Sequence, residues 1–159
     1  MQIPTTRICV VVDVPADRLW DRLSEYGTWG QWLTHVAESN IEGHDAAHVP
    51  VGAVRAVGPL GDPRTRERLV ACDAAAQLVS YEVAEEPKWR FPARRYRGTA
   101  RIIPLTDREG SVVEWSGAYD CDAKDEEAMR ELLTGLYYSF VSGLAQAAAN
   151  TGEDASEPN

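Results

Sequence analysis

Residues 123–149 read AKDEEAMRELLTGLYYSFVSGLAQAAA, and this stretch decides the fold. Its apolar residues recur at steps of three and four, which places them on one face of an α-helix. The residues of that face are Met129, Leu132, Leu133, Leu136, Tyr137, Phe140, Val141, Leu144, Ala145 and Ala148. Asp122 is the expected N-cap, and Asn150 and Gly152 mark the end. A helix of this length needs a large apolar surface to pack against.

The chain before this helix supplies mainly strands. Residues 6–14 alternate in polarity, which predicts a first strand, and Pro15 then opens a short helix. A second short helix is expected to end near Thr34. Six more strands are expected over residues 36–43, 52–57, 65–73, 78–85, 94–104 and 111–120. We therefore predict an α+β fold, in which a curved antiparallel sheet of about seven strands wraps around the C-terminal helix.

Length and composition narrow the class of protein. We expect one domain over residues 1–150, followed by a disordered acidic tail over residues 151–159. Apolar runs fall short of the roughly 20 residues that a membrane helix needs, so no membrane partner is expected. The net charge of −9 argues against nucleic acid as a partner.

The cysteines and one arginine-rich segment are two further local features of the sequence. The three cysteines are widely spaced, so we expect free thiols in a reducing cytoplasm, with buried packing roles. An arginine-rich segment runs over residues 88–101. These arginines form either an outward row on a strand or a site for an anionic ligand or partner.

One charged pair is predicted to lie inside the fold. Glu67 shares a strand face with Leu69 and should point inward, where an isolated carboxylate would need a partner. Arg55, on the neighbouring strand, is the nearest candidate. The pair is either a structural brace or a clamp for a ligand carbonyl or enolate.

Aromatic side chains are the second group of candidate site residues. Alternation points Tyr96 and Trp115 inward, and each aromatic is either core or a ligand contact. The candidate ligand-binding residues are Trp32, Tyr81, Trp115, Tyr119, Leu133, Tyr137 and Phe140. His35 is a candidate proton-transfer group. We expect no metal or organic cofactor, because the histidines lack metal-ligand spacing and no phosphate-binding glycine loop is present.

Several short motifs together resemble a known family. They are VPADRLW at 14–20, WGQW at 29–32, GAVR at 52–55, ERL at 67–69 and EW at 114–115. Over about residues 7–148 the chain resembles the START/Bet v 1-like superfamily, and within it the polyketide cyclase/dehydrase branch. The resemblance implies a helix-grip fold with a deep cavity between the sheet and the C-terminal helix.

A narrower resemblance covers residues 52–96, which are similar to the plant abscisic-acid receptors. It implies a gate-like loop at residues 58–63 and a latch-like loop at residues 86–92. Ala37 stands where those receptors carry a ligand-binding lysine, which argues against a carboxylic-acid hormone.

The resemblance implies two main functions. The first is a cyclase or dehydratase, in which Glu67 or His35 moves protons and Arg55 or a tyrosine such as Tyr96 polarises a carbonyl. The second is a non-catalytic carrier of a hydrophobic ligand, with the two loops as lids. A third possibility is a protein-interaction module that uses the arginine-rich face. In the first two cases the partner is a hydrophobic or aromatic small molecule, and the protein is a monomer or homodimer.

Overall fold

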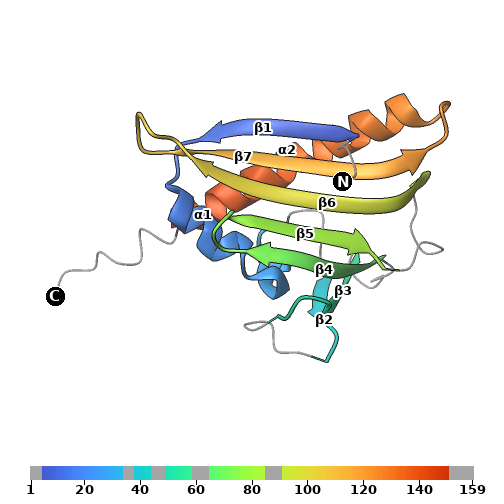
Figure 1. The fold of residues 1–159 in the computed structure, drawn as a ribbon, viewed down its shortest axis with the longest axis horizontal. Helices are drawn as coiled ribbons and strands as arrows, with labels where there is room; N and C mark the ends of the chain where they lie inside the picture. Colours follow the sequence, from blue (N-terminus) through green and yellow to red (C-terminus); the bar gives the residue numbers. More distant parts are fainter. Residues whose placement is uncertain (1–4, 34–37, 44–48, 59–64, 85–90, 151–159) are drawn as a thin grey trace.

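A seven-stranded antiparallel sheet packed against one long helix makes up the fold (Figure 1). The computed structural model describes residues 5–33, 38–43, 49–58, 65–84 and 91–150. In chain order the elements are β1 (Thr6–Val12), α1 (Ala16–Leu23), the 3₁₀ helix η1 (Tyr26–Gln31), β2 (Glu38–Ile41), β3 (Val54–Gly58), β4 (Thr65–Asp73), β5 (Leu78–Val83), β6 (Ala93–Pro104), β7 (Ser111–Cys121) and α2 (Glu126–Asn150). The sheet order is β1-β7-β6-β5-β4-β3-β2. This arrangement confirms the predicted helix-grip fold.

The helix α2 begins three residues later than its sequence pattern predicts. The Asp125 N–H donates to the Asp122 carbonyl, which closes a turn ahead of the helix. The Asp122 side chain lies 3.1 Å from Arg94 instead of capping. The first helical bond runs from the Met129 N–H to the Asp125 carbonyl, so the predicted role of Asp122 as N-cap was wrong.

The buried face of α2 is narrower than the predicted one. Its fully buried apolar side chains are Met129, Leu133, Tyr137, Val141, Leu144 and Ala148. Leu136, Phe140 and Ala145 lie half-buried along the margins of this face. Leu132 is 39% exposed, so its assignment to the buried face was wrong. None of the helices in the described part of the chain combines the length and apolar character that crossing a bilayer requires.

Three arginines of β6 point outward and pair with acidic side chains on the sheet surface. Arg94 pairs with Asp122, Arg95 with Asp120, and Arg97 with Glu82. Glu82 also receives a hydrogen bond from Arg68. Burial raises the pKa of the Glu82 carboxyl, but the hydrogen bonds from these two arginines outweigh burial and hold the pKa below its ordinary value. Over its described residues, 91–101, the segment therefore fits the outward-row interpretation.

The cysteines do not have the predicted buried roles. All three are free, but Cys9 and Cys72 are exposed and Cys121 is only partly buried. Cys9 lies on the outer face of the sheet, opposite Glu114. Cys72 and Cys121 lie at strand ends, where the rim of the sheet gives little cover.

Candidate functional site

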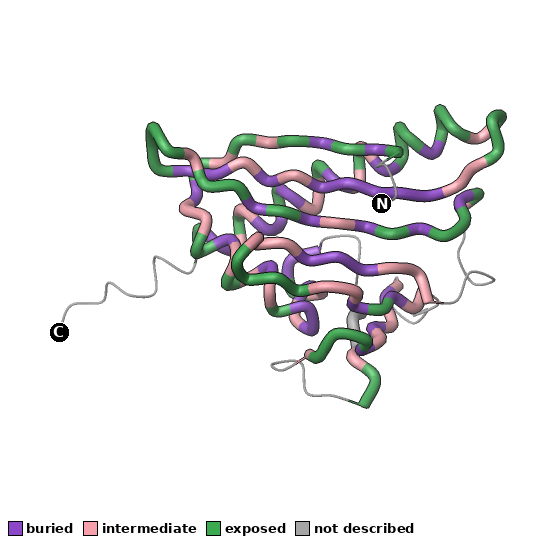
Figure 2. The backbone as a smooth tube through the Cα atoms, in the orientation of Figure 1, coloured by how far each residue is buried: buried purple, intermediate pink, exposed green. Residues whose placement is uncertain are grey.

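The space between the sheet, η1 and α2 is filled by aromatic side chains. In Figure 2 buried positions recur along β6, β7 and α2, which enclose this interior. Trp29 lies near its centre, with ring centroids 5.5 Å from Trp32 and 5.6 Å from both Tyr81 and Trp115. Phe140 packs 5.3 Å from Trp115. Most of the predicted ligand-binding aromatics therefore belong to one contiguous cluster.

The predicted pair of Arg55 and Glu67 is present and buried. The two residues lie opposite each other in the β3–β4 register, and Arg55 Nη2 is 2.5 Å from Glu67 Oε2. Arg55 shares its strand face with the buried Ala53 and Val57, so its side chain points inward. The side chain of Arg55 is 2% exposed, whereas that of Glu67 keeps 11%.

The helix η1 covers this pair and is bound to it. Arg55 Nη1 donates to the Tyr26 carbonyl at 3.3 Å, and the Tyr26 hydroxyl donates to the Glu67 carbonyl at 3.3 Å. The Arg55 guanidinium also stacks 4.1 Å from the Tyr26 ring centroid and 4.7 Å from that of Trp29. The pair thus joins β3 and β4 to η1, and the guanidinium contributes cation–π contacts in a desolvated setting.

The charge of Arg55 is stabilised by its neighbours. Burial alone lowers the pKa of the guanidinium, but the electrostatic influence of Tyr26 and Glu67 and the hydrogen bond to Glu67 raise it overall. Arg55 therefore keeps its charge inside the fold. Sequence reasoning missed Tyr26 and Trp29 as its partners. The glycines that bracket Trp29 were the available signal, because they mark a tight turn that places a bulky ring against the sheet.

Four other polar groups of the interior bond to one another. The Trp115 Nε1–H donates to the Tyr81 hydroxyl at 3.1 Å, and the hydroxyls of Tyr96 and Tyr137 are 2.7 Å apart. Two glycines make room for these phenols. A Cβ on Gly98 would lie 2.3 Å from the Tyr81 ring, and one on Gly117 would lie 2.2 Å from the Tyr137 hydroxyl.

Tyr119 lies at the margin of this network. Its hydroxyl is 2.8 Å from the Thr6 hydroxyl on β1, and its ring stacks on that of Tyr96 with centroids 6.3 Å apart. Leu133 is fully buried on the adjacent face of α2. His35 lies outside the described residues, as do most of the loops that the sequence analysis treats as lids.

The interior phenols are held in their neutral form. Burial is the main cause that raises the pKa of Tyr26, Tyr81, Tyr96 and Tyr137 above the ordinary tyrosine value. A neutral phenol can donate or accept a hydrogen bond, but it does not act as a base near neutral pH. Among the predicted catalytic residues that the structure describes, Glu67 is therefore the candidate base.

These shifted phenols predict alkaline unfolding. A raised folded-state pKa means that the stability contributed by the neutral phenols is complete below about pH 10 and is lost as the pH rises above that value. We expect tyrosinate absorbance from these four residues to appear together with the loss of far-ultraviolet circular dichroism, between about pH 10 and pH 12. Tyr138→Phe, at a position 52% exposed, is the control and should not move the transition. Ionisation of all the phenols in a chain that keeps its secondary structure would contradict the assignment.

Two nitrogen atoms of the cluster lack a hydrogen-bond partner. They are Arg55 Nε and Trp32 Nε1, and both are buried side-chain atoms in the described part of the chain. Both are donors. Unpaired buried donors are costly and uncommon in folded proteins.

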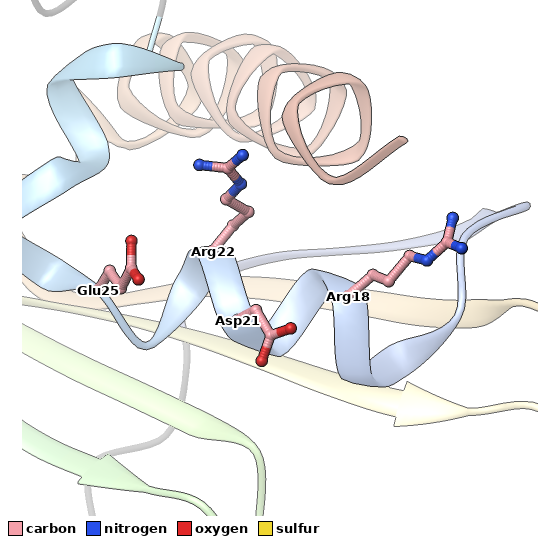
Figure 3. A pocket seen from close by; sticks show the side chains of 4 residues that line it. All are labelled: Arg18, Asp21, Arg22 and Glu25. Carbon is pink, nitrogen blue, oxygen red and sulfur yellow. The ribbon is translucent and has the colours of Figure 1, made fainter. Parts of the chain in front are cut away.

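Two surface hollows lie apart from this interior. One, of about 400 Å³, is lined by Arg18, Asp21 and Arg22 of α1 and by Glu25, and in Figure 3 Arg22 points toward α2. The other, of about 460 Å³, lies between α1, the β4–β5 turn and the end of β6. Their described linings contain none of the predicted site residues. Within the residues that the structure describes, no three His, Cys, Asp or Glu side chains cluster as metal ligands do.

A sheet that grips a long C-terminal helix around an aromatic interior defines a helix-grip protein of the Bet v 1-like class. The sequence model of one family, described as polyketide cyclase/dehydrase and lipid transport, matches residues 5–149. The chain belongs to this family. The resemblance inferred from the short motifs is therefore confirmed.

Solved structures share the fold at low sequence identity. A protein from Thermobifida fusca is 24% identical in sequence, with a TM-score of 0.76. The superposition covers 91% of this chain and 93% of the Thermobifida fusca chain. A protein from Nitrosospira multiformis is 22% identical with a TM-score of 0.72, covering 89% and 93%. Norcoclaurine synthase from Thalictrum flavum, in complex with dopamine and hydroxybenzaldehyde, is 18% identical with a TM-score of 0.70, covering 91% and 85%. No curated protein sequence matches the chain.

Proposed function

We propose that the protein binds a hydrophobic or aromatic small molecule between the sheet and α2 and acts on it as a cyclase- or dehydratase-like enzyme. The observation that carries this proposal is the buried Arg55–Glu67 pair, because its acidic member keeps 11% exposure beside the aromatic cluster. The carboxylate is the chemical type of group that accepts a proton, the Arg55 contact fixes where its oxygens lie, and the exposed part of its side chain adjoins the aromatic rings. Membership of the polyketide cyclase/dehydrase and lipid transport family supports the same function.

Each candidate site residue has a proposed role that follows from its chemistry. Glu67 is the proton-transfer group, and Arg55 orients it through the 2.5 Å contact. Tyr96 and the other neutral phenols supply hydrogen bonds to a polar group of the ligand. The unpaired N–H groups of Arg55 and Trp32 favour a ligand that presents acceptor oxygens, such as carbonyls. His35 stays a candidate from the sequence alone.

A non-catalytic carrier is the second candidate, and one observation favours it. The interior phenols already bond to one another, as Tyr96 does to Tyr137, so they can stabilise an apolar pocket without turning over a ligand. The family description also includes lipid transport. A carrier would hold its ligand through purification, whereas an enzyme would release its product.

The first step of the test is to find a ligand. Native mass spectrometry of the protein purified from its own host, followed by denaturing extraction, identifies any bound molecule. Phenolic amines and phenolic aldehydes are the first synthetic probes, because norcoclaurine synthase, which shares the fold, is seen with dopamine and hydroxybenzaldehyde.

The Glu67→Gln variant then distinguishes the enzyme hypothesis from the carrier hypothesis. For the enzyme, we expect turnover of the identified ligand to fall by at least about 100-fold while its dissociation constant changes less than about threefold. Glu114→Gln is the matched control, because Glu114 lies on the outer face of β7 and should leave both quantities unchanged. A wild-type protein that binds without turnover favours the carrier. If Glu67→Gln changes neither turnover nor binding, Glu67 is not part of the site.

A further inference from the structure

The strand β1 forms one edge of the sheet, as the strand order and Figure 1 show. One side of β1 pairs with β7 over Thr6–Val12, and no other described strand pairs with its second side. The unpaired backbone groups of an edge strand are a template for another strand. Natural edges are commonly protected by lysine or proline, and the β1 sequence TRICVVV contains neither.

Apolar side chains accompany this open edge on the outer face of the sheet. Val11 is 51% exposed, and it lies on the outer face of the edge strand, one residue before the end of β1. The register places it beside Val112 of β7, and Val112 lies beside Ile103 of β6, which is 38% exposed. The three side chains therefore form an apolar strip that begins at the edge.

We propose that β1 pairs antiparallel with β1 of a second copy of this chain, in the register centred on Val10. This register makes every side-chain pair complementary. On the outer face, Arg7 lies opposite Asp13 of the second copy, and Cys9 lies opposite Val11. On the inner face, Ile8 lies opposite Val12 of the second copy, and Val10 lies opposite Val10 of the second copy. β-Branched and opposite-charge pairs are the cross-strand pairs that stabilise antiparallel sheets.

Charge decides between the possible registers. The side chain of Arg7 is 58% exposed, and its contact with Glu114 is a long 3.7 Å, so the guanidinium can reach a second carboxylate. Asp13 is exposed beside the end of β1. The register centred on Cys9 would instead place Arg7 opposite Val11 and leave Asp13 without an opposing cation. Only the register centred on Val10 forms two such ion pairs, one at each end.

The pairing closes at two copies. A twofold axis through the paired strands uses the same surface on both chains, and each chain has one β1 edge. The opposite edge of the sheet, β2, is only four residues long and offers a poorer template. The assembly is thus a dimer with one sheet continuous across both copies.

The first test measures mass in solution. Native mass spectrometry and light scattering of the full chain at about 0.1 mM should give a dimer. Val11→Lys places two lysines at the pairing edge and should raise the dimer dissociation constant at least about tenfold. Val51→Lys makes the same chemical change at a position 61% exposed just before β3, far from β1 in the strand order, and should leave the dimer intact. A monomeric wild type, or equal effects of both substitutions, would overturn the proposal.

The second test reads the register directly. A Cys9→Ala, Val11→Cys variant is mixed with wild type and oxidised, and the products are identified by peptide mass mapping. The proposed register brings the introduced thiol opposite Cys9 of the wild-type copy, at a Cα separation of about 5 Å that a disulfide can span. We expect a covalent heterodimer through these two thiols. Crosslinks between two Cys9 thiols, or through Cys72 or Cys121 alone, would contradict the register.

Discussion

Replacing Arg55 by methionine is expected to lower the free energy of unfolding by about 3–5 kcal/mol, because it removes one member of a buried ion pair. The Glu67 carboxylate would lose its 2.5 Å partner while most of its surface stays inside the fold. The Tyr26 carbonyl would lose its donor, and the rings of Tyr26 and Trp29 would lose the guanidinium that stacks on them. Urea unfolding followed by circular dichroism measures the change.

The outer face of the same sheet provides the matched control. Arg68 pairs with Glu82 at 3.0 Å, but its side chain is 44% exposed. Arg68→Met should therefore cost less than about 1 kcal/mol. Adding Glu67→Leu to Arg55→Met should recover part of the loss, because no unpaired charge then stays buried. Equal effects of Arg55→Met and Arg68→Met would show that the inner pair does not brace the fold.

Gly143→Ala is expected to destabilise the protein by about 2–3 kcal/mol, although alanine is the better helix former. A Cβ at this position would lie 2.2 Å from the Trp32 carbonyl oxygen. That atom belongs to the backbone at the end of η1, so it cannot rotate away as a side-chain tip could. The substitution must push α2 away from η1 or distort both. Thermal and urea unfolding measure the effect.

Another glycine on the same helix, Gly135, provides a control in which alanine is expected to raise stability instead of lowering it. A Cβ on Gly135 would meet no atom within 4 Å, and the residue is exposed. Gly135→Ala should therefore raise stability by up to about 1 kcal/mol through helix propensity alone. If both substitutions stabilise the protein, the close contact between α2 and η1 does not exist in solution.

These two contacts explain how the interior is organised. Arg55 holds η1 to β3 and β4, and Gly143 lets α2 approach the end of η1 at Trp32. Trp29 and Trp32 are thereby fixed at the centre of the aromatic cluster. The bracing role of the ion pair is visible in its contacts, and the role of Glu67 in proton transfer is the part that the proposed experiments decide.

The sequence predicted the fold well because its patterns are long. The three- and four-residue spacing of α2 and the alternation of β4 each depend on many residues, so single exceptions do not alter the result. The expected range of β4, residues 65–73, agrees with Thr65–Asp73. Ends of elements were predicted less well. The start of α2 shifted because Asp122 found Arg94, a partner 28 residues away that local capping rules cannot foresee.

The burial of side chains was predicted correctly mainly on the strands, where the alternation of inward and outward residues gives each side chain a face. The inward directions of Glu67 and Tyr96 were predicted from strand faces, and the structure buries both side chains. The exposure of Leu132 was missed because periodicity gives a face but not the width of the surface that covers it. The exposure of Cys9 was missed because the general preference of cysteine for burial was followed, although Cys9 alternates with Ile8 and Val10. Tyr26 and Trp29 were missed as partners of Arg55 because η1 has too few residues to show a period.

Binding of a small aromatic molecule inside the fold is the central claim, and the indole N–H signals of the tryptophans test it most directly. Nuclear magnetic resonance of the ¹⁵N-labelled protein, titrated with the phenolic probes, reports on each indole separately. We predict saturable shifts for Trp29, Trp32 and Trp115 at the centre of the cluster, and little change for Trp20 on α1. Unchanged signals from the three central indoles, both with the phenolic probes and with any molecule extracted from the purified protein, would contradict the claim.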